Sequence, residues 1–290
     1  MIFVLGSCLY EIMFKNGLPE WSGPGGSAFN ASVSLARSGN PVHLITELAN
    51  DTLSHHITDF LEQNKIIYDE LRYEGNTRLS LAFLNDSGDA LYTFYPGQPE
   101  NAPEFILPEL NRQDVALFGS LYSLQERNRQ NVDAFIAKVR EAGAFLVYDP
   151  NFRKIAEVPL FKNRIQRIIN QVNLVRASDD DMFGIAGAQT GDEAYKFVSE
   201  VGCPNLIYTR NNGDVDLFTP DCRRTYPVKQ VAVVSTIGAG DAFNAGLISF
   251  ICQNRENEQN FEFWDKAIER ALIFAADVCG SHENYIRLPV

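Results

Sequence analysis

The chain has 290 residues, of which 45% are hydrophobic and 21% are charged, and its net charge at pH 7 is -12. This composition is ordinary for a globular protein, and the length is sufficient for one large domain with a substantial core. The acidic balance, with no basic cluster to offset it, excludes a nucleic-acid-binding protein, and no hydrophobic run is long enough to span a membrane.

The N-terminal sequence and the cysteines predict a cytoplasmic protein. Residues Met1–Gly6 lack the basic leader and cleavage site of a signal peptide, and they fit a buried first strand. The five cysteines are scattered, odd in number and never paired as C-x-x-C. We therefore expect reduced cysteines, with no disulfide framework and no zinc site.

Strand-like and helix-like segments alternate along the chain. Hydrophobic runs predict strands at Ile2–Leu5, Val42–Thr46, Val115–Gly119, Phe145–Tyr148, Val172–Arg176, Leu206–Thr209 and Val231–Ser235. Helical patterns lie between and after them, at Ala31–Ser38, Leu53–Asn64, Asn128–Ala142, Gly191–Val201, Ala242–Gln253 and about Trp264–Cys279. The alternation predicts an α/β fold with a mostly parallel sheet and helices on both faces. Because no repeat or linker interrupts it, we expect a single domain over residues 1–290.

One segment departs from this alternation. Arg78–Leu84 and Ala90–Tyr95 flank a turn that contains Gly88, which is the pattern of a β-hairpin. Antiparallel strands within a parallel fold suggest a small separate sheet. Such a sheet can cover a cleft or pair with a second subunit, and a plain extension of the main sheet is the third possibility.

The most informative segment is Val231–Phe243, which predicts an apolar strand, a tight glycine turn and a helix. Gly238 and Gly240 let backbone N–H groups approach a ligand, and the helix N-terminus adds positive potential, so the turn suits a phosphoryl group. Asp241 beside that anion fits a general base that takes a proton from an attacking hydroxyl. A helix-capping role for Asp241 is the alternative, and this segment alone favours neither.

Polar residues follow most of the predicted strands. They lie at Gly119-Ser120, Asp149–Arg153, Ser178–Asp181, Thr209–Gly213 and Gly238–Asp241. Ligands of open parallel sheets bind beyond the carboxyl ends of the strands, so we expect these groups to meet at one edge. Carboxylates beside an anion site suit phosphate, Mg²⁺ and a general base. Taken singly, these motifs are also common turn formers, and Asp179–Asp181 also fits simple helix N-terminal charge. P-loop and dinucleotide-binding motifs are absent.

Two motifs in order along the chain resemble the signatures of the ribokinase-like (PfkB) carbohydrate kinases. Ser235–Asp241, with its core G-A-G-D, is similar to the second signature, and Gly25–Ser32 with Gly39 beyond it is similar to the first. The resemblance covers essentially the whole chain. It is greatest to the fructokinases, through Asp-Pro-Asn-Phe-Arg at Asp149–Arg153 and through the predicted hairpin.

The resemblance implies a ribokinase-like fold with a small β-sheet lid, formed by about residues 10–30 and 66–101. It also implies an ATP- and Mg²⁺-dependent kinase that transfers the γ-phosphate to a primary hydroxyl of a sugar, for which fructose is the expected substrate. Relatives often dimerise through the lid, so a homodimer is expected. A kinase of a sugar acid such as 2-keto-3-deoxygluconate, a nucleoside kinase and a non-catalytic sugar-binding relative are the alternatives.

The resemblance also implies residue roles. Asp241 matches the catalytic base, and Gly238, Ala239 and Gly240 match the anion hole. Sugar-contacting positions correspond to Gly26, Asn30 and Arg153, with Arg153 also near the transferred phosphate. Thr209, Arg210 and Gly213 match a nucleotide-binding loop.

Several positions depart from the family pattern. Ser7 replaces a Glu, and Glu11 stands where relatives have a sugar-binding Asp. The Asn-x-x-Glu motif appears as Ser178–Asp181, in which Ser178 would lie at the nucleotide and Asp181 would hold Mg²⁺ through water. Asn211 replaces a frequent glycine of the nucleotide loop. Ser235 replaces an acidic residue that can help bind a monovalent cation, which leaves potassium activation open.

Overall fold

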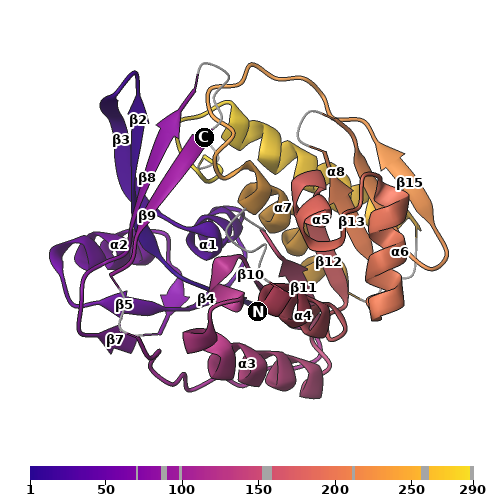
Figure 1. Cartoon of the computed structure of the whole chain (residues 1–290), viewed down its shortest axis with the longest axis horizontal. Helices are drawn as coiled ribbons and strands as arrows, with labels where there is room; N and C mark the ends of the chain where they lie inside the picture. The colour runs from indigo at the N-terminus through magenta and orange to yellow at the C-terminus, as the bar shows by residue number, and fades with distance from the viewer. Residues whose placement is uncertain are drawn as a thin grey trace. The chain divides into compact units, whose positions relative to one another are not determined.

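The computed structural model describes residues 1–69, 71–85, 90–97, 100–151, 159–210, 213–255 and 261–287. The chain forms two compact units (Figure 1). One contains Met1–Phe105 and Gln230–Val290, and the other contains Ile106–Lys229. Within the described ranges, no helix is both long and apolar enough to cross a membrane.

The first unit contains three parallel strands in the order β1-β4-β6. They span Ile2–Leu5, Val42–Ile45 and Ile67–Tyr68. All four side chains of β1 are buried, which explains its uninterrupted hydrophobic sequence. The helices of this unit are α1 (Ser27–Arg37), α2 (Thr52–Gln63), α7 (Ala239–Asn254) and α8 (Phe261–Cys279). A short parallel pair joins β5 (Glu47–Ala49) to β7 (Leu71–Tyr73).

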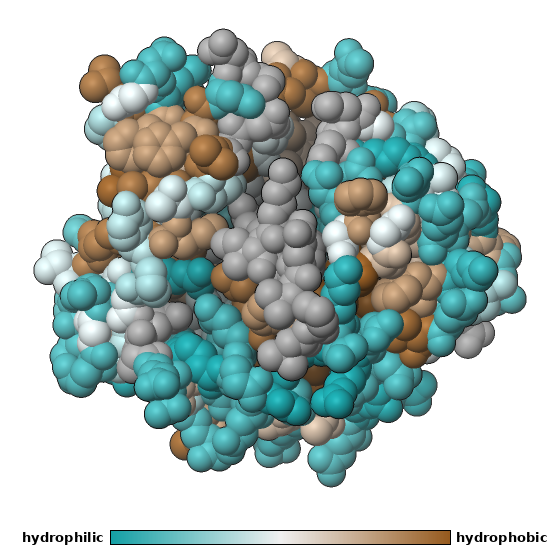
Figure 2. All heavy atoms as spheres, viewed as in Figure 1, coloured by the Kyte–Doolittle hydropathy of each residue, from teal (hydrophilic) through white to brown (hydrophobic). Residues whose placement is uncertain are grey.

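A separate four-stranded sheet in this unit has the order β3-β2-β8-β9. Its strands span Leu18–Gly25, Leu9–Lys15, Leu79–Leu84 and Ala90–Tyr95. The predicted hairpin is confirmed, because β8 and β9 pair antiparallel. Met13 and Ala82 on one face pack against Ile237. The other face carries Phe83 and Leu91 into solvent, and Figure 2 shows hydrophobic surface over this sheet at the upper left.

The second unit is built on six strands in the order β15-β14-β13-β12-β11-β10. The four parallel strands are β10 (Val115–Gly119), β11 (Phe145–Asp149), β12 (Leu174–Ser178) and β13 (Leu206–Thr209). The antiparallel edge consists of β14 (Val215–Phe218) and β15 (Arg223–Tyr226). Its helices are α3 (Arg129–Glu141), α4 (Pro159–Ile169), α5 (Asp179–Ala186) and α6 (Gly191–Val201).

The prediction of a strand at Val231–Ser235 is wrong. The segment is extended loop, and Val231, Val233 and Val234 expose 36–53% of their surface. Its backbone contacts include the amides of Val234 and Ser235, which both donate to the Cys279 carbonyl. An apolar run becomes a strand only where a neighbouring strand satisfies its backbone, and no such partner lies beside this run in the described part of the chain.

Other elements also differ from the sequence-based expectation. The strand predicted at Val172–Arg176 begins two residues later, because Asn173 makes a turn in which its side chain accepts a hydrogen bond from the Leu146 amide at 2.8 Å. Helices α4 and α5 and the strands β14 and β15 were not predicted. All five cysteines lie within the described residues, and none of them is joined in a disulfide there.

Candidate active site

The N-termini of α1 and α7 meet in the first unit. Both helices follow a glycine with positive φ, +105° at Gly26 and +80° at Gly238, a conformation that other residues adopt at a cost. A Cβ at Gly26 would lie 2.7 Å from the Ser7 carbonyl, and one at Gly238 would lie 2.1 Å from the Asn284 carbonyl. The local backbone therefore requires glycine at both positions.

Asp241 is the carboxylate at this meeting point. It is the third residue of α7 and exposes 8% of its surface. Ser27 Oγ donates to its Oδ1 at 2.5 Å, and Asn30 Nδ2 donates to its Oδ2 at 2.8 Å. Hydrogen bonds to both oxygens stabilise the negative charge, as do the positive ends of the two helices.

The capping alternative for Asp241 is wrong. The N-cap of α7 is Gly238, and no side chain caps the helix by a hydrogen bond. The Asp241 carboxylate instead accepts hydrogen bonds from residues more than 200 positions away in the sequence.

The first turn of α7 presents backbone donors. The Ala239 amide donates to the Thr236 carbonyl at 3.3 Å, a long contact, and the Gly240 amide has no acceptor among the described residues. Amides at a helix start, with the dipole behind them, form an anion site. This geometry supports the predicted anion hole of Gly238, Ala239 and Gly240.

Glu11 lies on β2 and is 5% exposed. Asn284 Nδ2 donates to Glu11 Oε1 at 2.8 Å, and Asn284 itself is 1% exposed. A Cβ at Gly25, the residue before Gly26, would lie 3.6 Å from Glu11 Cβ and 4.0 Å from Asn284 Nδ2. The predicted sugar contacts Glu11, Gly26 and Asn30 therefore belong to one neighbourhood of the first unit, with Asn284 among them.

Buried oxygen atoms of this unit lack hydrogen-bond partners among the described residues. They include Ser7 Oγ, Asn30 Oδ1, Ser80 Oγ and Asn284 Oδ1. Ser80 pairs with Glu11 in the β2–β8 register, so the two side chains share a face of the sheet. Buried polar atoms are usually satisfied, so this group of orphaned oxygens marks a place where a ligand with several hydrogen-bond donors can bind.

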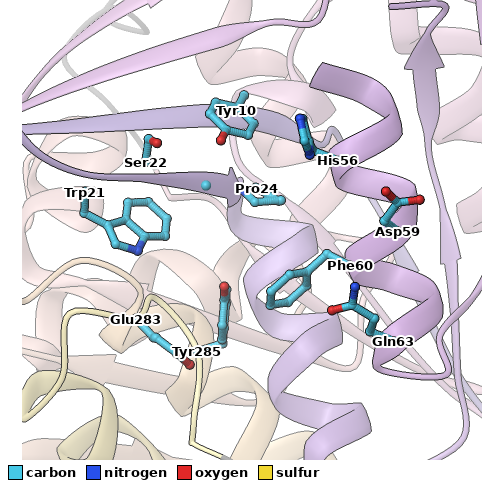
Figure 3. Close-up of a pocket in the computed structure, with 11 residues that line it drawn as sticks. Tyr10, Trp21, Ser22, Pro24, His56, Asp59, Phe60, Gln63, Glu283 and Tyr285 are labelled. Atoms are coloured by element: carbon cyan, nitrogen blue, oxygen red, sulfur yellow. The ribbon is translucent and has the colours of Figure 1, made fainter. Parts of the chain in front are cut away.

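A pocket of about 380 Å³ lies on the same unit (Figure 3). Its aromatic wall consists of Tyr10, Trp21, Phe60 and Tyr285, and its polar lining includes Asp59 and Glu283. Figure 3 shows the Tyr285 hydroxyl directed into this space. Glu283 and Tyr285 flank Asn284, and Gly23, which also lines the pocket, pairs with Glu11. The pocket therefore borders the neighbourhood of Glu11.

The remaining predicted residues belong to the second unit, at the carboxyl ends of β11, β12 and β13. Arg176 links these strands, because its guanidinium donates to Asp149 Oδ2 at 3.3 Å and to Thr209 Oγ1 at 3.0 Å. The parallel register places Asp149, Ser178 and Thr209 at the same edge, as the sequence predicted. Arg153 and Asn211 lie outside the described residues.

Asp181 is buried beside these strand ends. Ser178 is the N-cap of α5, and its backbone amide and hydroxyl donate to Asp181 Oδ2 at 2.8 and 2.7 Å. Burial, followed by the nearby Asp149 carboxylate, raises the pKa of Asp181 to about 6 against the lowering effect of the Ser178 hydrogen bonds. The simpler interpretation of Asp179–Asp181 is also correct, because all three residues lie in the first turn of α5.

The neighbouring carboxylates of Asp149 and Asp181 fit a divalent cation, because its positive charge would relieve their mutual repulsion. No group of three or more His, Cys, Asp or Glu side chains suited to a metal occurs in the described part of the chain. Mg²⁺ keeps most of its water and is usually bound through one or two carboxylates together with substrate phosphates, so Asp149 and Asp181 would suit it.

The nucleotide-loop residues of the prediction lie around a second buried acid. Arg210 forms an ion pair with Asp216, which is 2% exposed and also accepts a hydrogen bond from Thr225 Oγ1 at 2.7 Å. A Cβ at Gly213 would lie 3.1 Å from Arg210 Cβ, so this glycine packs against the arginine.

Sequence reasoning missed Ser27, Asn284 and Arg176. Ser27 stands inside the first motif, next to Gly26, and that position was the available signal. Asn284 lies in a polar stretch after the last helix and matches no motif. Arg176 lies within a predicted strand, where the expected role was burial.

Two kinases are similar to this chain in sequence. Aminoimidazole riboside kinase of Salmonella typhimurium is 24% identical over 289 residues, which cover 97% of this chain and 88% of that protein. A fructokinase of Rhizobium leguminosarum bv. trifolii is 28% identical over 264 residues, 86% of this chain and 79% of that protein.

A solved structure has the same fold. The crystal structure of fructokinase from Vibrio cholerae O395, with fructose, ADP and calcium ion bound, matches with a TM-score of 0.90 at 19% identity. The match covers 99% of this chain and 95% of that chain, which confirms the predicted α/β ribokinase-like fold. Residues 18–283 match the model of the pfkB family of carbohydrate kinases, so the chain belongs to this family.

Proposed function

We propose that the protein is an ATP- and Mg²⁺-dependent sugar kinase that phosphorylates a primary hydroxyl, with fructose as the acceptor and Asp241 as the general base. The observation that carries the proposal is the position of Asp241. Its carboxylate is held by Ser27 and Asn30, and Asp241 directly follows Ala239 and Gly240, whose amides lie at the start of α7.

The reaction requires a proton acceptor and a site for the transferred group. The attacking hydroxyl would donate to Asp241, which takes its proton as the bond to phosphorus forms. The amides of Gly238–Gly240 would stabilise the charge on the transferred phosphoryl oxygens. In phosphoryl transfer the protein itself has little covalent chemistry to do. Positioning and charge stabilisation therefore supply most of the rate acceleration.

The acceptor sugar would bind to the orphaned oxygens of the first unit. Glu11, Asn30 and Asn284 offer hydrogen-bond acceptors to a ligand rich in hydroxyl groups. Gly26 lets the α1 backbone approach this ligand, and Arg153 would contact its phosphorylated end. Fructose satisfies these requirements, and the fructokinase relative supports it.

The nucleotide would contact residues of the second unit. We assign its phosphates and base to Ser178, Thr209, Arg210 and Gly213. Asp181, aided by Asp149, would hold Mg²⁺ through water. When bound, the ion supplies positive charge that offsets the phosphate oxygens.

A riboside is the second candidate acceptor. The relative that covers 97% of the chain is an aminoimidazole riboside kinase. The pocket that borders Glu11 has Tyr10, Trp21 and Phe60 in its wall, and such rings can stack on a heterocyclic base. A sugar acid is less well suited, because Glu11 and Asp241 would face its carboxylate.

A substrate panel tests the proposal. ADP formation would be measured with ATP, Mg²⁺ and a set of ketoses, aldoses, 2-keto-3-deoxygluconate and ribosides. We expect the highest kcat/KM with fructose. Turnover of ribosides alone would transfer the assignment to the second candidate, and turnover of no acceptor would support a non-catalytic relative.

A further inference from the structure

We infer that Asn284 is a positioning residue that fixes the Glu11 carboxylate for acceptor binding, an inference that rests on the proposed function. The two residues are 273 positions apart in the sequence and joined by one buried hydrogen bond of 2.8 Å. Asn284 exposes 1% of its surface and Glu11 exposes 5%. A carboxylate at this depth is stabilised by directed hydrogen bonds, and the Asn284 amide provides one of them.

The segment that carries Asn284 is held on both sides. Before it, Glu283 forms an ion pair with Arg37 at 2.7 Å. After it, the Tyr285 ring lies under the Arg37 guanidinium at 4.7 Å, and the Ile286 carbonyl accepts from Arg37 at 2.8 Å. Arg37, at the end of α1, therefore clamps the residues on either side of Asn284. The amide is in place before any ligand binds, which lowers the cost of ordering the site.

Asn284 contacts both parts of the candidate site. Its side-chain amide donates to Glu11. Its backbone carbonyl oxygen would lie only 2.1 Å from a Cβ added at Gly238. Asn284 therefore contacts both the Glu11 carboxylate, which we assign to acceptor binding, and Gly238, the glycine that begins the anion hole. Its Oδ1 is buried and has no partner among the described residues, so it can accept a hydrogen bond from the acceptor as well.

Glu11 needs such a support because its side chain is long. A glutamate has one more rotatable bond than an aspartate, and its carboxylate samples more positions unless a neighbour holds it. A carboxylate has about four lone-pair sites, so Glu11 can accept from the Asn284 amide and from hydroxyl groups of the acceptor as well. The pair thus selects the orientation in which Glu11 can bind the acceptor.

Moving one methylene group from the Glu11 side chain to the Asn284 side chain tests this role. Glu11→Asp shortens one side chain, Asn284→Gln lengthens the other, and the double variant restores the combined length. We expect each single variant to raise the KM for the acceptor about 10-fold, as for the loss of one hydrogen bond of about 1–1.5 kcal/mol. The KM for ATP should stay within about 2-fold, and the double variant should recover a large part of the acceptor KM.

Asn40→Gln is the matched control. Asn40 is a buried amide of the same unit that donates to Ser249 Oγ at 2.9 Å, and it has no part in the site. We expect this variant to lower the melting temperature and to leave the acceptor KM unchanged. Calorimetric binding of the acceptor to each variant, without ATP, gives a second measurement that does not depend on turnover.

The outcomes separate this inference from the proposed function. A wild-type enzyme that is active, with single variants that keep the acceptor KM and affinity, would overturn the role of Asn284 alone. Equal losses in the single and double variants would also overturn it, because a purely structural defect is not repaired by a methylene exchange. A wild-type protein that binds no acceptor would overturn both.

Discussion

At the scale of single residues, the environment of Asp241 is the most consequential feature of the molecule. Two donors from α1 hold its carboxylate, and Asp241 directly follows Ala239 and Gly240 in the first turn of α7. Gly238 occupies the N-cap position, so Asp241 is not the N-cap of α7, and we propose a catalytic role for it. The proposed role of Asp241 and of the glycine that begins α7 can be tested by substituting single residues.

The first prediction is that Asp241→Asn abolishes most of the activity. The amide keeps the shape of the side chain but cannot accept the proton, so kcat should fall by about 10²–10⁴. The acceptor KM and the melting temperature should change little. Asp133→Asn, at an exposed position on α3, is the control. A kcat near that of the wild type would end the catalytic interpretation.

A second prediction concerns the glycine that begins α7. Gly238→Ala should destabilise the protein and lower kcat, since the added Cβ would displace the Asn284 backbone. Gly39→Ala is the control that separates backbone strain from steric clash. The φ of Gly39 is +84°, but nothing lies within 4 Å of a Cβ added there. Urea unfolding should show a loss of about 1–2 kcal/mol for Gly39→Ala, from the left-handed backbone alone, and a larger loss for Gly238→Ala. If the two variants lost a similar free energy of unfolding, the clash between the added Cβ at Gly238 and the Asn284 backbone would be easily relieved, against this prediction.

At the scale of elements, the start of α2 depends on a contact with the approach to β8. Asp51 is the N-cap of α2 and accepts from the Ser54 amide at 2.8 Å. It also accepts from the Thr77 amide and hydroxyl, at 2.6 and 2.5 Å. Burial alone raises the pKa of Asp51, but these hydrogen bonds lower it overall. The carboxylate thus joins the helix to a distant loop.

The third prediction follows from that depressed pKa. Above the unfolded-state pKa of about 3.9 the ionised Asp51 stabilises the fold, and this stability is lost as the pH falls toward the lower folded-state pKa. Asp51→Ala should cost about 1–2 kcal/mol at neutral pH and less at pH 3. Melting temperatures from pH 3 to 7 would measure this difference, and a loss that does not depend on pH would contradict it.

The outer face of the four-stranded sheet is the second element with a testable consequence. Phe14 and Phe83 stack there at 4.9 Å, and Phe83, Leu91 and Tyr95 expose 39%, 75% and 53% of their surface. Contiguous exposed hydrophobic surface of this kind marks an interaction site. A second copy of the chain can cover it with an identical face, so we propose a homodimer through this sheet.

The fourth prediction is a dimer by light scattering at micromolar concentration. Phe83→Lys combined with Leu91→Lys should give a monomer, because like charges would then face each other across the interface. Ile273→Lys, at an exposed position on α8, should leave the dimer intact. A wild-type monomer under these conditions would refute the proposed assembly.

At the scale of the whole molecule, the predicted functions divide between the two units. The proposed acceptor contacts Glu11, Asn30 and Asn284 belong to the first unit, and the proposed nucleotide and metal residues Thr209 and Asp181 belong to the second. This division follows the chain, since the first unit combines its N-terminal part with the last 61 residues, Gln230–Val290.

The fifth prediction is that variants of the two units have separable kinetic effects. Asn30→Ala should raise the acceptor KM about 10-fold or more and leave the Mg²⁺ requirement unchanged. Asp181→Asn should raise the Mg²⁺ concentration needed for half-maximal rate and leave acceptor affinity, measured without ATP, unchanged. Mg²⁺ titrations and calorimetry would measure both. If Asp181→Asn weakens acceptor binding as strongly as Asn30→Ala does, the proposed division is wrong.

The sequence by itself determined the family, the alternation of strands and helices, the hairpin of β8 and β9, and the motif around Asp241. These features depend on neighbours in the chain: hydrophobic period, turn glycines and short motifs. For that reason β1, β10, β13 and α6 have the predicted bounds. Positive φ at Gly26 and Gly238 likewise agrees with glycine at both positions.

Only the tertiary structure decided which residues meet. Val231–Ser235 has the composition of a strand, but no strand lies beside it among the described residues, so its backbone forms a loop. Ser27 and Asn284 contact Asp241 and Glu11 across 214 and 273 positions of sequence, and no local pattern encodes such a pairing. A hydrogen bond between distant side chains depends on how the elements pack, and that packing is a property of the folded chain.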